Sequence, residues 1–147
     1  MAHYTYWKNQ YPKIDMNLGM FGENLTTEGL IEDSVHIGYE FLNGSARLIA
    51  TQPRIPCYKL GIKFGRMNII KSFISRLRPG NYFKVLQEGE VGFGDKIKLV
   101  HYEKDRGSIK DIVCIYKDDD IKDVETMKRV TKISALPEGV KNLFRRK

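Results

Sequence analysis

The sequence predicts a mainly β fold with added α structure: a β-rich body over about residues 21–103, followed by three helices over 107–147. Two observations predict this arrangement. Alternating apolar side chains and turn residues recur in the first two thirds of the chain, whereas helical spacing of apolar residues begins after Ser108. A length of 147 residues suits one domain with a small appendage, and such a chain can bury a sizeable core without disulfides.

The most distinct strand pattern is a hairpin. In VHIGYEFL, residues 35–42, apolar side chains alternate with the period of a strand that buries one face. Asn43-Gly44 is a favoured two-residue turn, and SARLIATQ, residues 45–52, is expected to return as the partner strand. The apolar positions of the first strand are Val35, Ile37, Tyr39 and Phe41.

The other elements are predicted from the spacing of apolar residues, every second residue in strands and every third or fourth in helices. Residues 3–11, HYTYWKNQY, are expected to form a helix that ends at Pro12. Strands are predicted over 82–87 and 95–102, a loop over 118–120, and C-terminal helices from Ser108 (as N-cap), over 121–132 and over 137–146. Residues 67–77 are expected to form a helix whose buried face carries Met67, Ile70, Phe73, Ile74 and Leu77.

Composition narrows the function classes. The chain is 41% hydrophobic and 29% charged, as in ordinary globular proteins. No apolar run reaches the roughly 20 residues that span a bilayer, and the N-terminal residues lack the apolar core of a signal peptide. Two cysteines far apart in sequence indicate reduced thiols, so a cytoplasmic protein is expected.

The net charge of +7 is unevenly distributed. Residues 1–60 hold 5 basic and 6 acidic side chains, whereas residues 61–147 hold 20 and 12, a net +8. Such a half suits an anionic ligand, a phosphate-bearing cofactor or nucleic acid, although a solvated basic surface explains the same numbers. The basic side chains that motivate a nucleic-acid contact are Lys128, Arg129, Lys132, Arg145, Arg146 and Lys147.

The stretch QPRIPCYKL, residues 52–60, places a thiol in a stiff and basic setting. Pro53 and Pro56 restrict the backbone that leads to Cys57, and Arg54 and Lys59 lie close in sequence. Nearby cations favour the thiolate, which is the form that attacks or binds a soft metal. A structural thiol is the alternative. The second cysteine, in DIVCIY at position 114, is expected in the core.

Other chemistries have weaker sequence support. His3, His36 and His101 show no short ligand spacing with either cysteine, which argues against zinc, but a cysteine–histidine pair formed in space stays open. GEVGFG, residues 89–94, lies between predicted strands and lacks the helix of a phosphate-binding loop.

The stretch FGENLTTEG, residues 21–29, is a candidate binding loop. Gly22 and Gly29 permit close backbone approach, and the residues between them are rich in hydrogen-bonding groups. The alternative is a turn with a helix cap at Thr27. The polar side chains of the loop are Glu23, Asn24, Thr26 and Thr27.

FGENLTTEGL, QPRIPCYKL, PGNYFKVLQEGEV and FGDKIKL occur here in the order and spacing of the MOSC family, which is named after the C-terminal domain of molybdenum-cofactor sulfurases. The chain resembles the stand-alone members that end in three helices. This resemblance implies a distorted β-barrel, similar to the pyruvate-kinase barrel domain, over residues 1–103 and a three-helix appendage over 104–147.

The resemblance also implies an activity. Members bind the molybdenum cofactor (molybdopterin) and reduce N-hydroxylated compounds such as hydroxylaminopurines, using electrons from a flavin or iron–sulfur partner protein. Cys57 is the implied molybdenum ligand and catalytic residue. A non-catalytic cofactor carrier or sulfur-transfer module is the alternative, and pyridoxal-phosphate binding is a further family-level association. The implied cofactor-binding positions are Glu23, Asn24, Arg54, Lys59 and Lys84.

The chain departs from the family pattern in three places. The initial strands with a GD element and a GG-rich segment are not found ahead of HYTYW, so we expect a short or truncated member whose exposed strand edges favour self-association. Gly38-Tyr39 stands where an outer turn often has Gly-Asp. Lys84 stands where many members have arginine, and lysine keeps the charge without the bidentate geometry.

Overall fold

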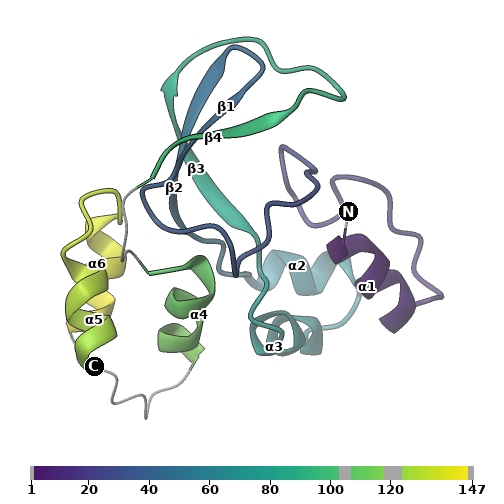
Figure 1. Cartoon of the computed structure of the whole chain (residues 1–147). Helices are drawn as coiled ribbons and strands as arrows, with labels where there is room; N and C mark the ends of the chain where they lie inside the picture. Colours follow the sequence, from purple (N-terminus) through teal and green to yellow (C-terminus); the bar gives the residue numbers. More distant parts are fainter. Residues whose placement is uncertain (1, 103–106, 118–123, 146–147) are drawn as a thin grey trace.

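The computed structural model describes residues 2–102, 107–117 and 124–145. Within these ranges the chain forms six helices and four strands, and the strands make one antiparallel sheet in the order β3-β2-β1-β4 (Figure 1). The strands are β1 (Glu40–Asn43), β2 (Ala46–Pro53), β3 (Asn81–Gln87) and β4 (Ile97–His101). The helices are α1 (Ala2–Gln10), α2 (Tyr58–Lys63), α3 (Asn68–Ser75), α4 (Ile109–Lys117), α5 (Val124–Thr131) and α6 (Glu138–Arg145).

The predicted hairpin is confirmed, but its turn lies one residue later than expected. Asn43 pairs with Ala46, so the two turn residues are Gly44 and Ser45 rather than Asn43 and Gly44. Gly44 has φ 57°, and a Cβ there would lie 2.1 Å from the carbonyl oxygen of Glu90. A glycine is therefore needed at the first turn position, both for its backbone angle and for the close approach of the β3–β4 loop.

Strand β1 begins at Glu40, not at Val35 as predicted. Gly38 has φ 89°, which interrupts the extended path. Val35 and Ile37 are nevertheless buried, since this stretch packs against the start of the C-terminal helices, where the N–H of Ile109 donates to the carbonyl of Val35 at 2.9 Å. The apolar alternation therefore identified buried residues but overstated the length of the strand.

The helix predicted over 67–77 is α3, although its buried face differs from the expected one. Ile69 and Phe73 are buried, whereas Met67 is 55% exposed. The short helix α2, which the sequence did not predict, is the neighbour of Met67. A Cβ at Gly61 of α2 would lie 2.4 Å from the sulfur of Met67, so Met67 contacts α2 and is not part of the buried face of α3.

One core cluster is aromatic and fixes α1. Trp7 is 1% exposed and stacks on Phe73 of α3, with ring centroids 5.1 Å apart and an interplanar angle of 9°. Phe21 lies against both rings, at 6.4 Å from Trp7 and 5.6 Å from Phe73. The cluster thereby joins α1, α3 and the loop that begins at residue 21.

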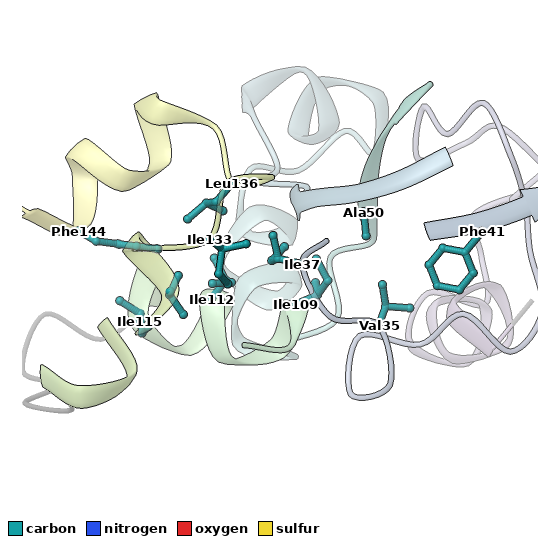
Figure 2. Close-up of a cluster of buried hydrophobic side chains, with 11 residues drawn as sticks. Val35, Ile37, Phe41, Ala50, Ile109, Ile112, Ile115, Ile133, Leu136 and Phe144 are labelled. Carbon is teal, nitrogen blue, oxygen red and sulfur yellow. The ribbon is translucent and has the colours of Figure 1, made fainter. Parts of the chain in front are cut away.

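A second core cluster joins the sheet to the C-terminal helices. Phe41 and Ala50 from the sheet belong to the same cluster as Ile109 and Ile112 of α4 and Phe144 of α6 (Figure 2). The three predicted helices are present here as α4, α5 and α6. The predicted boundary at 103/104 and the predicted loop at 118–120 lie outside the described residues.

Helix α4 begins as the sequence predicts. Ser108 Oγ accepts from the N–H of Asp111 at 3.1 Å, while a carboxylate oxygen of Asp111 accepts from the N–H of Ser108 at 2.8 Å. This reciprocal pair is a capping box. Cys114, which was expected in the core, is only partly buried.

Glu32 is a fully buried carboxylate that links three parts of the chain. Its Oε1 accepts from the N–H of Gly80 at 2.7 Å and lies 3.4 Å from Nε2 of His3 in α1. Its backbone carbonyl accepts from the N–H of Lys110 in α4 at 3.2 Å. Glu32 therefore ties α1, the turn before β3 and the first turn of α4 to one point.

We expect Glu32→Ala to lower the free energy of unfolding by about 2–4 kcal/mol, because the amide of Gly80 and the ring of His3 lose a buried acceptor. Urea-induced unfolding followed by circular dichroism measures the change. Glu28→Ala is the matched control, since Glu28 is exposed and should change stability by no more than about 0.5 kcal/mol. Equal losses in the two variants would contradict the role assigned to Glu32.

Candidate functional site

A cavity of about 360 Å³ lies between the inner face of the sheet and the loop that begins at Phe21. This volume is in the range of small-molecule sites. Its apolar wall includes Phe41, Leu48 and Ile97 from the sheet and Phe73 from α3. The polar part of the wall comes mainly from the predicted binding loop, including Glu23, Asn24, Thr26 and Thr27.

Glu23 is held by three donors. Its Oε1 accepts hydrogen bonds from the hydroxyl of Tyr4, the N–H of Gly19 at 2.8 Å and Oγ1 of Thr26 at 3.0 Å. The Tyr4 oxygen also accepts from the N–H of Met20 at 3.1 Å. Helix α1 therefore positions the loop, and it fixes the orientation of the Glu23 carboxylate.

These contacts shift two ionisation equilibria. Burial alone raises the pKa of Glu23, but the hydrogen bonds from Tyr4, Gly19 and Thr26 together lower it below its ordinary value. Burial and the hydrogen bond to Glu23 raise the pKa of Tyr4 to about 12. At neutral pH Glu23 is therefore a carboxylate, and Tyr4 is a neutral donor.

Two buried acceptors on the cavity wall have no hydrogen-bond partner among the described residues. They are Oε2 of Glu23 and Oδ1 of Asn81. Buried polar atoms are nearly always paired in native proteins. Because both atoms only accept, the cavity suits a ligand that presents N–H groups.

Arg54 brings the two motif segments together. It lines the cavity, its backbone N–H donates to the carbonyl of Gly80 at 2.9 Å, and its guanidinium carbon lies 6.0 Å from the ring centre of Phe73. A Cβ at Gly22 would lie 3.7 Å from Nη2 of Arg54. The FGENL and QPRIP stretches are therefore neighbours in space.

Cys57 lies next to the cavity wall in sequence but does not line it. Its side chain is exposed, and its backbone is extended (φ −113°, ψ 173°) immediately before α2. Cys57 follows Arg54 by three positions, so the two Cα atoms are no more than about 11 Å apart. The thiol is accessible and is not packed among aliphatic side chains.

The other predicted site residues fall into two groups. Asn24 lines the cavity together with Glu23 and Arg54, whereas Lys59 in α2 and Lys84 in β3 are exposed and lie outside its wall. No helix starts within four residues of Thr27, so the alternative prediction of a helix cap there is wrong. The cavity geometry therefore assigns no role to Lys59 or Lys84.

Sequence reasoning missed three contributors to this region. Tyr4 was assigned only to a helix, and no spacing rule links it to Glu23, which lies 19 residues away. Asn81 lies between the helix predicted over 67–77 and the strand predicted over 82–87, and it was given no role. The third contributor had a readable signal: residues 54–81 contain seven basic and no acidic side chains, namely Arg54, Lys59, Lys63, Arg66, Lys71, Arg76 and Arg78.

Histidines and acidic residues do not gather into a metal centre. Among the described residues there is no group of three or more His, Cys, Asp or Glu side chains that could hold a metal ion. His3 contacts Glu32, and His36 stacks on Tyr39 with ring centroids 4.9 Å apart.

Two further sequence expectations can be placed. Lys128, Arg129 and Lys132 lie at or near α5, and Arg145 of α6 forms an ion pair with Glu138, while Arg146 and Lys147 lie outside the described residues. Nucleic-acid binding by this region stays a prediction. No helix in the described part of the chain is long and apolar enough to cross a membrane.

We expect Tyr4→Phe to reduce the free energy of unfolding by about 1–2 kcal/mol at neutral pH, because it removes a hydrogen bond to a carboxylate. The raised pKa of Tyr4 gives stability that is full below pH 10 and is lost as pH rises toward 12. The lowered pKa of Glu23 gives stability that is full above its ordinary value of 4.5 and is lost as pH falls below that value.

Urea unfolding across these two pH windows measures both effects, and the variant should lose the alkaline dependence and part of the acidic one. Tyr6→Phe, on the same helix, is the control because no hydrogen bond joins Tyr6 to Glu23. An unchanged pH profile in Tyr4→Phe would contradict the role of this pair.

Comparison with known proteins supports the family assignment. The MOSC domain model matches residues 1–98. The chain is 32% identical to YflK of Bacillus subtilis over 145 residues, which is 99% of this chain and 65% of that protein. It is 35% identical to YiiM of Escherichia coli over 100 residues, 67% of this chain and 45% of that protein. The chain thus spans less than two thirds of either relative.

A fungal protein named reductase, from Gibberella moniliformis, is 31% identical over 113 residues, 75% of this chain and 20% of that protein.

Solved structures are also similar. The crystal structure of YiiM from Geobacillus stearothermophilus matches 99% of this chain and 73% of its own, with TM-score 0.91 and 33% identity. Escherichia coli YiiM matches 99% of this chain and 72% of its own, with TM-score 0.87 and 27% identity. The motifs, the fold and these matches together show that the chain belongs to the MOSC domain family.

Proposed function

We propose that this chain binds the molybdenum cofactor through Cys57 and reduces N-hydroxylated compounds, such as hydroxylaminopurines, with electrons from a partner protein. The observation that carries the proposal is the position of Cys57. An exposed thiol on a restricted backbone, adjacent in sequence to a cavity wall, is accessible to a soft metal. Family membership makes molybdenum the metal to test first.

The cavity supports binding of a nitrogen heterocycle that carries a phosphate. Oε2 of Glu23 and Oδ1 of Asn81 can accept hydrogen bonds from ring or amino N–H groups, as a pterin or an aminopurine presents them. Arg54 can donate to phosphate oxygens, and the other cations of residues 54–81 attract the same charge. The aromatic wall formed by Phe21, Phe41 and Phe73 excludes water from the heterocycle.

The overall reaction consumes two electrons and two protons: an N–OH group becomes N–H, and its oxygen leaves as water. When bound, the cofactor supplies this two-electron redox chemistry. The chain has two cysteines, too few for the four-thiolate site of an iron–sulfur cluster, and so the proposal requires an external donor. A flavin or iron–sulfur protein is the class of partner that meets this need.

We also propose that the sheet is one wall of the distorted β-barrel that the resemblance implies, with α4, α5 and α6 as the appendage. The strand order and the cavity on the inner face of the sheet support this arrangement. The proposed barrel and appendage are separate in chain order, but they share the second core cluster and so do not have separate cores.

The decisive experiment is metal analysis of protein purified from a host that makes molybdopterin. We expect the wild-type chain to retain molybdenum and Cys57→Ala to contain at least about tenfold less metal per chain. Mutation of a residue that only hydrogen-bonds to a metal ligand already lowers metal affinity by ~10–100-fold, and removal of the ligand itself should lower it at least as much. Cys114→Ala is the matched control and should retain the metal, because Cys114 lies in α4. Molybdenum that is absent from the wild type, or equally present in Cys57→Ala, would overturn the proposal.

A specific observation also favours a second candidate, the cofactor carrier or sulfur-transfer module. Cys57 is exposed and is not part of the cavity wall, which suits a thiol that hands sulfur or cofactor to another protein. Turnover separates the candidates. Metal-loaded protein given a chemical electron donor and hydroxylaminopurine should release aminopurine if it is a reductase, whereas a carrier would bind the metal without turnover.

A further inference from the structure

Helix α2 presents one continuous exposed face. Its buried residues are Leu60 and Gly61, and Gly61 lies against Met67 just ahead of α3, which runs beside α2 (Figure 1). At about 100° per residue, the other four residues of the helix fall within about 140° of its circumference. With Met67 they form what is termed the α2 surface below. The four residues, all exposed, are Tyr58, Lys59, Ile62 and Lys63.

Part of the α2 surface is apolar. Tyr58, Ile62 and Met67 are each more than half exposed. Tyr58 and Ile62 are neighbours because they are four positions apart in a helix. Gly61 is the next position around the helix from Tyr58, so Met67, which contacts Gly61, adjoins the same face. Apolar side chains exposed singly need no explanation, but a group of them with a polar rim is typical of an interaction site.

The charges on and beside this surface are all positive. Residues 57–75 contain four basic side chains and no acidic one, and all four are exposed. Lys63 donates to the carbonyl oxygen of Gly19 at 2.9 Å, a neutral acceptor that leaves its charge uncompensated. Such a surface attracts an acidic partner, whereas two copies of it would repel each other. The basic residues are Lys59, Lys63, Arg66 and Lys71.

The α2 surface begins at the exposed thiol and lies outside the cavity. Cys57 is the N-cap of α2, and six residues make the helix only about 9 Å long. The cavity wall includes no residue of α2. A protein that covers α2 therefore comes close to Cys57 and leaves the cavity free for a small molecule.

We propose that the α2 surface is the docking site of an acidic electron-donor protein. This inference rests on the proposed function, which requires an external donor. The donor loses two electrons for each N–OH group that becomes N–H, solvent supplies two protons, and the oxygen leaves as water. Electron-transfer complexes bury little area, below about 1,200 Å² in total, so a short helix with its neighbours is sufficient. Tyr58 and Ile62 supply the apolar contact, and the cations attract and orient the donor.

The test is binding of two acidic carriers, a flavodoxin and a [2Fe–2S] ferredoxin, to the full chain as purified. Calorimetric titration at low and high salt measures the Kd. We expect the wild type to bind at least one carrier, more weakly at high salt. Ile62→Glu and Ile62→Lys lose the same apolar contact but differ in the sign of the new charge. Ile62→Lys should therefore bind the carrier about tenfold more tightly, or better, than Ile62→Glu.

Val124→Glu is the matched control, because Val124 is 53% exposed but lies in α5. It should bind the carrier as the wild type does, and all three variants should keep the wild-type circular dichroism spectrum. In the metal-loaded chain, Ile62→Glu should reduce turnover supported by the carrier by about tenfold or more. Its molybdenum content, and its turnover with reduced methyl viologen, should be unchanged.

If neither carrier binds the wild type, or if the two Ile62 variants bind equally, the proposal is wrong. Binding to vesicles of phosphatidylserine and phosphatidylcholine that Ile62→Glu abolishes, without carrier binding, would assign the α2 surface to a membrane instead. The titration needs no metal or substrate. A wild-type chain that lacks molybdenum but binds a carrier would thus refute the proposed function and not the docking site.

Discussion

One carboxylate oxygen, Oε1 of Glu23, fixes the wall of the candidate site. The chain between α1 and β1 contains no helix or strand, so no backbone ladder can hold it in place. The hydroxyl of Tyr4, the N–H of Gly19 and the hydroxyl of Thr26 converge on this oxygen instead. Burial opposes the charge on Glu23, and the three donors more than offset that cost. The second oxygen of the same carboxylate is left buried and unpaired on the cavity wall. One oxygen of Glu23 thus holds the loop in place, and the other is available to a ligand.

The site separates a fixed pocket from an accessible thiol. Glu23, Arg54 and Asn81 belong to the pocket, whose wall is pinned by the aromatic cluster around Trp7 and by the Glu32 contacts. Cys57 lies a few residues beyond Arg54, with its side chain in solvent. A cofactor that spans both places can bury its heterocycle in the pocket and keep its metal end within reach of a second molecule. The proposed reductase, which would depend on an external electron donor, needs such access.

Local patterns in the sequence predicted the elements, whereas contacts between distant residues determined the details that the sequence missed. The hairpin, α1, α3, β3, β4 and the capping box of α4 follow from period, turn residues and caps, which act over a few residues. The turn moved from Asn43-Gly44 to Gly44-Ser45 because Gly44 also has to admit the Glu90 carbonyl from another loop. Met67 lies against Gly61 of α2, a helix absent from the prediction, and stays 55% exposed, while α3 buries Ile69. For the site, the motif segments identified Glu23, Asn24 and Arg54 as cavity residues, but the partners of Glu23 are set by tertiary packing alone.

The distribution of charge favours an anionic ligand at the α2–α3 region over nucleic acid at the C-terminus. Residues 54–81 carry seven basic and no acidic side chains, and Arg54 reaches the cavity from this segment. Residues 103–147 carry twelve basic and nine acidic side chains, so their net charge is only +3. Arg145 there is already paired with Glu138, as Arg78 of residues 54–81 is with Asp33. The like charges of residues 54–81 repel one another, which destabilises the folded chain. Binding of a polyanion or a phosphate among them reduces this repulsion. Several of these cations also rest on aromatic rings, as Arg76 does on Tyr6 at 3.4 Å and Arg66 on Tyr11 at 5.1 Å. Those contacts stabilise the concentrated charge in the free protein.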